Sequence, residues 1–432
     1  MLGLLAQAGY HITPRADDAQ VVIVNTCSFI GPARDEAAVA LGQASRLRLS
    51  GNCHVLVAAG CWPQQQPEIV RDLFPSVDAM VGAGEFHRIV PIVEQALARC
   101  DAEPLQIIGQ PTYLYSHTTP RLRATPPWYA YLKLAEGCNH RCSFCAIPAI
   151  RGRFRSRSIR SVVAEARQLV GTGVRELILV AQDTTSYGID RYRQRMLPSL
   201  LRKLSRIKDL RWIRVLYAHP THLTDELVEV MATEEKVCSY FDLPFQHADA
   251  DLLRCMHRAG CGDAYLRLIE RIRMRLPEVT LRTSLLVGFP GETRAKFRRL
   301  LAFLRVAEFD RVGVFAYSRE KGTAAAQLPN QVPAQVAQDR RDQLMSEQQG
   351  ISRGRNRRWV GRTMEVVIEG SDRRGRWLGR SHRDAPEIDG LVYVGAPAKG
   401  TPPPRGRFIN VRITRTLPYD LISETTDTTA LV

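Results

Sequence analysis

The chain has 432 residues, of which 45% are hydrophobic and 24% charged, values that are ordinary for globular proteins. This length is too great for one compact domain and predicts two or three. The composition excludes a mainly disordered or fibrous chain, and no apolar run approaches the roughly 20 residues of a membrane helix. The first residues lack the basic and small-residue features of a signal peptide. We therefore expect a cytoplasmic protein that makes no membrane contact.

The charge is distributed unevenly along the chain. Lys and Arg number 60 against 44 Asp and Glu, a formal net charge of +16. The first 100 residues hold seven Arg, no Lys and nine acids, so the whole excess lies in the later part. Arginines cluster at Arg151–Arg160 and at Arg353–Arg358. One such cluster is usually a solvated face, but the asymmetry between regions predicts an anionic partner for the later domains.

Residues 1–101 are predicted to form a doubly wound α/β domain. Val21–Val24 and Val55–Ala59 are short apolar runs typical of buried parallel strands, and Arg34–Leu47 between them has helical spacing. The segment Met1–Tyr10 is helical in pattern, so the strand expected before it is absent. Residues 102–127 contain prolines and no clear period, which predicts a linker.

Residues 128–356 are predicted to form an open (β/α)6 barrel, two units short of the eight-stranded form. Residues 357–424 lose the helical signal and predict a small antiparallel β-barrel, of a class that often binds nucleic acid. The six expected strands of the first barrel are Tyr131–Ala135, Leu177–Ala181, Trp212–Ala218, Tyr240–Phe245, Thr280–Gly288 and Arg311–Tyr317. Its expected helices are Ile159–Val170, Leu223–Ala232, Ala264–Arg275 and Arg294–Val306. The second barrel has the runs Thr363–Glu369, Arg376–Ser381, Leu391–Val394 and Phe408–Thr414.

A CxxxCxxC motif, formed by Cys138, Cys142 and Cys145, directly follows the first expected barrel strand. Thiolates suit zinc or iron–sulfur clusters. Three cysteines on one loop can hold three irons of a four-iron cluster and leave the fourth for another ligand. Structural zinc held with a histidine such as His140 is the alternative, but zinc sites typically pair two short knuckles and no second knuckle follows. The loop also lies at the carboxyl end of a strand, where barrels place their chemistry.

This motif and the six βα units resemble the radical S-adenosylmethionine (SAM) superfamily, in which the open iron chelates the methionine moiety. The resemblance implies that Phe144 packs against the adenine and that the segment from Gly288 through Gly291 to Glu292 lies under the adenosyl group. Gln182, after the second strand, and Arg282, on the fifth, are further candidates for binding this cofactor. His247, after the fourth strand, is expected to be a hydrogen-bonded structural group.

The segments around Cys27 and Cys61 resemble the N-terminal domain of the methylthiotransferase family, and the C-terminal barrel resembles its TRAM barrel. Residues 182–188, 243–248 and 384–390 resemble the RimO branch, which modifies an aspartate of small-subunit ribosomal protein twelve. The resemblance implies methylthiolation of the aspartate β-carbon, with two 4Fe-4S clusters and SAM as cofactors. The implied partners are that ribosomal protein, RNA at the basic C-terminal barrel and an electron-donor protein. The alternatives are a transfer-RNA adenosine methylthiotransferase or, from a different class, an RNA-binding scaffold with a structural metal.

The same resemblance assigns Cys27 and Cys61 to the second cluster. Both follow parallel strands, so they should meet at one sheet edge. The family's third ligand is missing together with the first strand, and Cys53 precedes its strand, on the order of 20 Å or more from Cys61. Either the given sequence omits an N-terminal extension, which we favour, or the second cluster lacks a ligand and sulfur insertion fails. The remaining cysteines are expected to be structural: Cys100, Cys238, Cys255 and Cys261.

Overall fold

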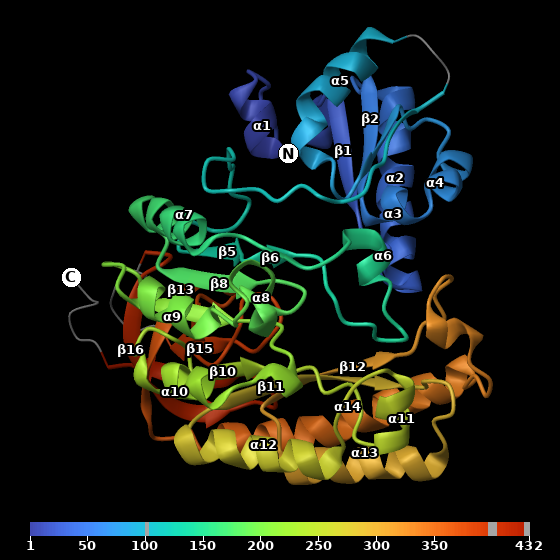
Figure 1. Ribbon diagram of the computed structural model, residues 1–432. Coiled ribbons are helices and arrows are strands. Elements are labelled where there is room, and N and C mark those ends of the chain that lie inside the picture. Colours follow the sequence, from blue (N-terminus) through green and yellow to red (C-terminus); the bar gives the residue numbers. More distant parts are fainter. Residues whose placement is uncertain (100–102, 396–403, 427–432) are drawn as a thin grey trace. The chain divides into compact units, whose positions relative to one another are not determined.

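The computed structural model describes residues 1–99, 103–395 and 404–426 (Figure 1). The chain forms two compact units. The first unit contains residues 1–124, 135–157 and 318–326, and the second contains the rest. Within the described ranges, no helix combines the length and apolar character needed to cross a membrane.

The first unit is built on a four-stranded parallel sheet in the order β1-β2-β3-β4. Its strands are β1 (Val21–Thr26), β2 (Val55–Gly60), β3 (Ala79–Gly82) and β4 (Leu105–Ile107). Its helices are α1 (Leu2–Gln7), α2 (Gly31–Ser50), α3 (Cys61–Gln65), α4 (Pro67–Leu73) and α5 (Ile89–Ala98).

Helices cover both faces of this sheet, because successive side chains of a buried strand point to opposite sides. Val57 and Ala59 of β2 face α1 and α5, whereas Leu56 and Ala58 face α2, α3 and α4. The predicted doubly wound domain is confirmed. The segment predicted as a linker contributes β4, which pairs with β3; a strand of three residues is too short to show a period.

The first unit also contains the segment that carries the three-cysteine motif. It runs from β6 (Ala135–Glu136) through α6 (Ile147–Arg151) to β7 (Arg155–Ser156), and β6 pairs with β7 in antiparallel fashion. Residues 318–326 join the same unit at the start of α2. There the Gly31 amide donates to the carboxylate of Glu320 at 2.9 Å, and Arg34 forms an ion pair with the same carboxylate.

The second unit contains six parallel strands in one series, β5-β8-β9 and β10-β11-β12. The two groups meet where the Cys238 amide donates to the Ile213 carbonyl at 2.9 Å and the Ala218 amide donates to the Asp242 carbonyl at 3.0 Å. The predicted six-stranded open barrel is thereby confirmed. The strands are β5 (Tyr129–Lys133), β8 (Glu176–Val180), β9 (Trp212–Val215), β10 (Tyr240–Asp242), β11 (Thr280–Val287) and β12 (Arg311–Ala316).

Helices connect these strands, and several begin at a side chain that the sequence marks as a cap. The Ser158 hydroxyl accepts from the Ser161 amide at the start of α7, and Thr224 does the same for Leu227 at the start of α10. The α-helices are α7 (Ile159–Gly171), α8 (Ile189–Tyr192), α9 (Leu197–Ser205), α10 (Asp225–Thr233), α11 (Ala250–Cys255), α12 (Gly262–Arg275), α13 (Arg294–Ala307) and α14 (Ala334–Arg357). The sequence did not predict α9 or the long α14.

The C-terminal part of the second unit is a closed barrel in the order β13-β14-β15-β17-β16. Its strands are β13 (Thr363–Ser371), β14 (Trp377–Ser381), β15 (Val392–Gly395), β16 (Phe408–Thr416) and β17 (Leu421–Thr425). The sequence predicted the first four strands and missed β17. The barrel is also not wholly antiparallel, because β15 and β17 close it as a parallel pair.

The two barrels of the second unit share a core. Val367 and Ala385 of the C-terminal barrel pack with Trp212 and Tyr240 of the central barrel. The buried carboxylate of Glu176, which begins β8, accepts from Arg214 at 2.9 Å and from Arg380 of β14 at 2.5 Å.

Candidate functional site

The first unit contains all five cysteines predicted to hold iron. Cys27 is exposed and Cys61 is buried, while Cys138, Cys142 and Cys145 are partly exposed. Phe144, between the last two, is half-buried.

Cys27 and Cys61 lie at the same edge of the sheet, as predicted. Thr26, the last residue of β1, pairs with Gly60, the last residue of β2, and each cysteine comes directly after one of them. Gly60 makes this turn possible: its φ is 105°, and a Cβ there would lie 2.6 Å from the Thr26 carbonyl oxygen. Cys53 lies at the opposite end of β2, where the next residue bonds back to Gln20 ahead of β1. The geometric argument that separates Cys53 from Cys61 is therefore confirmed.

Cys61 has a cationic neighbour that the sequence did not reveal. Arg151, the last residue of α6, donates from Nη2 to the sulfur of Cys61 at 3.2 Å, and its Nη1 lies 3.9 Å from the buried carboxylate of Glu136. Burial raises the pKa of the Cys61 thiol, and the Arg151 guanidinium opposes that rise. Arg151 thus favours the thiolate, which is the form that binds metal.

The three-cysteine loop is held by its ends. The Cys138 amide donates to the Gly152 carbonyl at 3.1 Å, and the Cys145 amide donates to the Cys142 carbonyl at 3.0 Å. Gly137 has a φ of 80°, and a Cβ there would overlap the Arg153 carbonyl oxygen at 2.2 Å, so glycine is required before the first cysteine.

This loop fits an iron–sulfur cluster. The His140 amide donates to the sulfur of Cys138 at 3.4 Å, a kind of contact that tunes cluster thiolates. Three partly exposed thiols on one anchored loop are a suitable donor set for three irons.

The two predicted cluster sites are neighbours within the first unit. Ala146, which follows Cys145, and Ile150 of α6 pack in one small apolar cluster with Cys61 and Ala83. Figure 1 shows α3, which begins at Cys61, beside α6. The segment that follows the three-cysteine loop therefore packs directly against Cys61.

The second unit contains the remaining predicted cofactor residues. Gln182 follows β8, and its Oε1 is buried and has no hydrogen-bond partner among the described residues. A buried amide oxygen without a donor costs free energy, on the order of 1–3 kcal/mol. This orphaned acceptor fits the prediction that Gln182 binds an ammonium-bearing cofactor such as SAM.

Arg282 of β11 is engaged by two carboxylates of the protein. Its Nη1 lies 2.8 Å from Asp242 and its Nε lies 3.6 Å from Asp389 of the C-terminal barrel, and these charges raise the pKa of the guanidinium against the opposing effect of burial. Arg282 therefore holds the two barrels of the second unit together, whether or not it also reaches a ligand.

Glu292 fixes the glycine-containing segment that follows β11. Its buried carboxylate accepts from the Gly288 amide, from Nε2 of His247 at 3.2 Å and from Arg340 at 2.7 Å. Gly288 and Gly291 both have positive φ, 74° and 80°. Nδ1 of His247 also accepts from the Asp249 amide at 2.9 Å, which confirms the structural role expected of this histidine.

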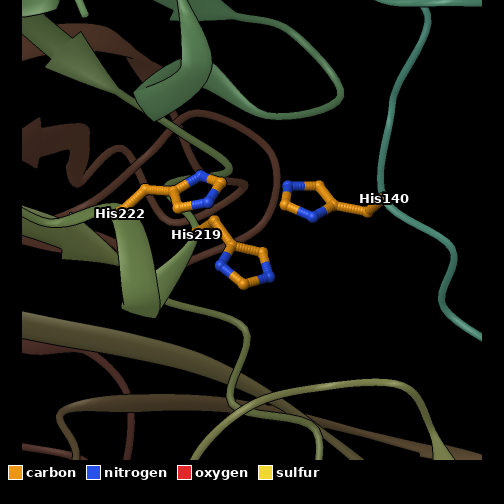
Figure 2. A group of neighbouring side chains, drawn as sticks. All are labelled: His140, His219 and His222. Carbon is orange, nitrogen blue, oxygen red and sulfur yellow. The ribbon is translucent and has the colours of Figure 1, made fainter.

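One polar cluster was not predicted from the sequence. Asp183, after β8, is 2% exposed and lies 3.1 Å from Nδ1 of His222, after β9. His219 lies on the same turn as His222, and the centroids of the two rings are 4.8 Å apart (Figure 2). The spacing of His219 and His222 was a usable signal, but their partner lies far away in sequence.

A parallel six-stranded open barrel and a three-cysteine loop define the class of radical SAM proteins. In agreement, residues 132–304 match the Radical SAM superfamily, residues 360–425 match the TRAM domain and residues 1–82 match uncharacterized protein family UPF0004. The radical S-adenosylmethionine methyltransferase TsrM of Kitasatospora setae, solved with cobalamin and a 4Fe-4S cluster, superposes with a TM-score of 0.53. At 17% identity over 71% of this chain and 66% of that one, this likeness shows the fold alone.

Relatives extend along nearly the whole chain. Ribosomal protein uS12 methylthiotransferase RimO of Heliobacterium modesticaldum is 48% identical over 427 residues, which are 99% of this chain and 91% of that one. The protein of the same name from Gloeobacter violaceus is 49% identical over 98% of this chain and 94% of its own length. The chain belongs to the RimO family of radical SAM methylthiotransferases.

Proposed function

We propose that this protein adds a methylthio group to the β-carbon of an aspartate in small-subunit ribosomal protein uS12. The observation that carries the proposal is the full-length similarity, 48% over 99% of the chain, to proteins named for uS12 methylthiotransfer. The cysteine loop and the orphaned acceptor of Gln182 support it, since a radical SAM enzyme needs sites for a cluster and for SAM. A ribosomal substrate implies action in the cytoplasm.

The residues that would hold the first 4Fe-4S cluster are Cys138, Cys142 and Cys145. With SAM bound, such a cluster supplies a 5′-deoxyadenosyl radical that removes hydrogen from an unactivated carbon. Gln182 and the segment from Gly288 to Glu292 would orient SAM, with Phe144 against its adenine. The buried ion pairs of Glu292 would keep that segment rigid.

We assign Cys27 and Cys61 to the second cluster, where sulfur would be presented. Their shared position at the sheet edge and the contact from Arg151 to the sulfur of Cys61 support this assignment. The packing of Cys61 with Ala146 supports a short path between the two clusters, because Ala146 follows the last ligand of the first cluster.

The C-terminal barrel is a candidate RNA contact. It has exposed arginines on its strands and loops, and it matches the TRAM domain. These arginines are Arg373, Arg374, Arg405, Arg407, Arg412 and Arg415. They would bind ribosomal RNA near uS12 with a strong salt dependence. We also expect an electron-donor protein to reduce the first cluster.

The test is mass spectrometry of uS12 and of bulk transfer RNA from a strain that lacks this gene and from the complemented strain. We expect uS12 to lose the methylthio mass in the deletion strain and regain it on complementation, with transfer RNA unchanged. Loss of a methylthioadenosine with unmodified uS12 in both strains would instead identify a transfer-RNA enzyme. Normal modification of both uS12 and transfer RNA in the deletion strain would exclude both enzyme activities and favour the alternative of an RNA-binding scaffold.

A further inference from the structure

A buried carboxylate lies at the carboxyl end of β8, outside the cysteine sites and the predicted SAM contacts. Asp183 accepts from the hydroxyls of Thr185 and Ser186, both at 2.5 Å, and from the Ser186 amide at 3.2 Å. These contacts cap the short turn Thr184–Ser186 and fix the carboxylate in one orientation.

The same carboxylate also orients a histidine from the next strand. Nδ1 of His222 lies 3.1 Å from Oδ2 of Asp183 and 3.2 Å from the Ser186 hydroxyl. The backbone before His222 is tied to the same turn, since the His219 amide donates to the Thr185 hydroxyl at 3.1 Å. The loops after β8 and β9 are therefore joined into one rigid element, and 22% of the His222 side chain remains exposed.

This arrangement determines what His222 can do. A carboxylate only accepts hydrogen bonds, so Nδ1 of His222 is the donor in its contact with Asp183. In the imidazolium form of a histidine, Nε2 is a donor as well and can bind an anion. The second imidazole, His219, lies 4.8 Å away, tilted by 36° (Figure 2). Both imidazoles lie on the turn after the carboxyl end of β9, beside the loop that follows β8, at the edge where barrels of this kind bind substrates.

We propose that His222, oriented by Asp183, binds the side-chain carboxylate of the target aspartate; this inference rests on the proposed function. The carboxylate is bonded directly to the β-carbon that reacts, so a donor that holds it also positions that carbon. A site built to pair with a carboxylate also rejects asparagine, because the exchange removes the negative charge and replaces one acceptor oxygen with an NH2 donor. His222 is thus a substrate-binding residue, and Asp183 is a positioning residue that acts through it.

The test compares the wild type with His222→Gln, Asp183→Asn and the control His54→Ala, which changes an exposed histidine before β2. Two quantities are measured for each: the formation of 5′-deoxyadenosine without substrate, and kcat and KM for uS12. We expect His222→Gln to raise KM by about 10- to 100-fold, the value of one charged hydrogen bond, and Asp183→Asn to raise it less. The rate of substrate-free SAM cleavage should stay within about twofold of the wild-type rate. Thermal unfolding of each variant is measured in parallel, and unchanged unfolding temperatures would show that the effect on KM is local.

A second readout uses uS12 in which asparagine replaces the target aspartate. The wild type should discriminate strongly against it in kcat/KM, and His222→Gln should lose most of that discrimination. Unchanged KM and unchanged discrimination in His222→Gln would overturn the inference while leaving the proposed function intact. Loss of substrate-free SAM cleavage in a folded His222→Gln would also overturn it, since the residue would then serve the cofactor. A wild type that leaves uS12 unmodified would overturn the proposed function and this inference with it.

Discussion

The phenol oxygen of Tyr240, on β10 of the central barrel, lies 2.6 Å from Oδ2 of Asp389, in the loop between β14 and β15 of the C-terminal barrel. Arg282 approaches the other oxygen of the same carboxylate. Nearby, Asp384 of the same loop forms a buried ion pair with Arg311 at 2.6 Å. The C-terminal barrel therefore supplies charges to the interior of its neighbour, and the two should unfold together.

Glu176→Gln should be strongly destabilising. The substitution keeps the side-chain shape but leaves the guanidiniums of Arg214 and Arg380, both at most 1% exposed, without their shared carboxylate. Breaking a buried ion pair in this way costs about 3–5 kcal/mol. Urea unfolding measures the loss as a lower midpoint of the transition of the second unit, with an unchanged slope.

The matched control for that variant is Asp251→Asn, which removes the exposed pair with Arg254 on α11. An exposed pair contributes about 0–1 kcal/mol, so this variant should unfold close to the wild type. Equal effects of Glu176→Gln and Asp251→Asn would show that the buried network does not stabilise the protein.

His382 should make stability depend on pH. Burial and the charges of Arg383 and Arg214 lower the pKa of His382 to about 4. In the unfolded chain the same histidine has a pKa of about 6.5, so as the pH falls the unfolded state takes up a proton before the folded state does. The contribution of neutral His382 to the free energy of unfolding is fully present above about pH 6.5. It should decline as the pH falls towards 4, by up to about 1.4 kcal/mol per pH unit for one proton.

The measurement is urea unfolding of the wild type and His382→Gln at several pH values. Carboxylates titrate in the same range in both proteins, so the difference between the two curves isolates His382. Parallel curves would contradict the prediction. His54→Gln, at an exposed position, should follow the wild type throughout.

Much of the fold could be predicted because buried parallel strands are short, nearly continuous apolar runs. Glu176–Val180 and Trp212–Val215 are buried almost throughout and were located to within a few residues. The missed elements lack such a signal. β4 has three residues, and α14 is a helix with few apolar positions whose buried side chains include Gln348 and Arg355. Arg355 belongs to an arginine run that suggests a solvated face, yet it pairs with Asp310 at 3.1 Å inside the protein.

The site could be predicted only where ligands are close in sequence or share a strand-end pattern. Spacing located the three-cysteine loop, and strand ends located Cys27 and Cys61. The contact of Arg151 with Cys61 joins residues 90 positions apart, and that of Asp183 with His222 joins residues 39 positions apart. Such pairs depend on tertiary packing, for which one sequence contains no local signal. Cys100 lies outside the described residues, so its expected structural role stays a prediction.

Cys142→Ala should abolish cleavage of SAM while the chain still folds. Cys142 is partly exposed on a loop whose ends are anchored by backbone hydrogen bonds, so the fold does not need its side chain. Two remaining thiolates hold a cluster poorly. Substitution of a residue that only contacts a metal ligand lowers metal affinity or activity by about 10- to 100-fold. Loss of a ligand itself should therefore lower 5′-deoxyadenosine formation at least about 100-fold.

The control for Cys142→Ala is Cys255→Ala, which removes an exposed thiol at the end of α11. Both proteins are reconstituted anaerobically with iron and sulfide and then reduced with dithionite. Cys255→Ala should cleave SAM like the wild type. Retained cleavage in Cys142→Ala would mean that the three-cysteine loop is not the site of the first cluster.

Iron content should distinguish Cys61 from Cys53, although both are buried cysteines next to β2. Cys61 lies at the sheet edge with Cys27 and accepts from Arg151, whereas Cys53 lies at the other end of the strand, where its thiol donates to the Val55 carbonyl at 3.5 Å. In a protein whose three loop cysteines are replaced by alanine, all remaining cluster iron should belong to the second site. Cys61→Ala on that background should remove this iron, up to about four irons per chain for a full cluster, whereas Cys53→Ala should leave the iron content unchanged.

Arg151→Gln should lower iron retention partially, because the sulfur of Cys61 loses its charged donor. If Cys53→Ala depletes iron as far as Cys61→Ala does, the second cluster cannot lie at the carboxyl edge of the sheet.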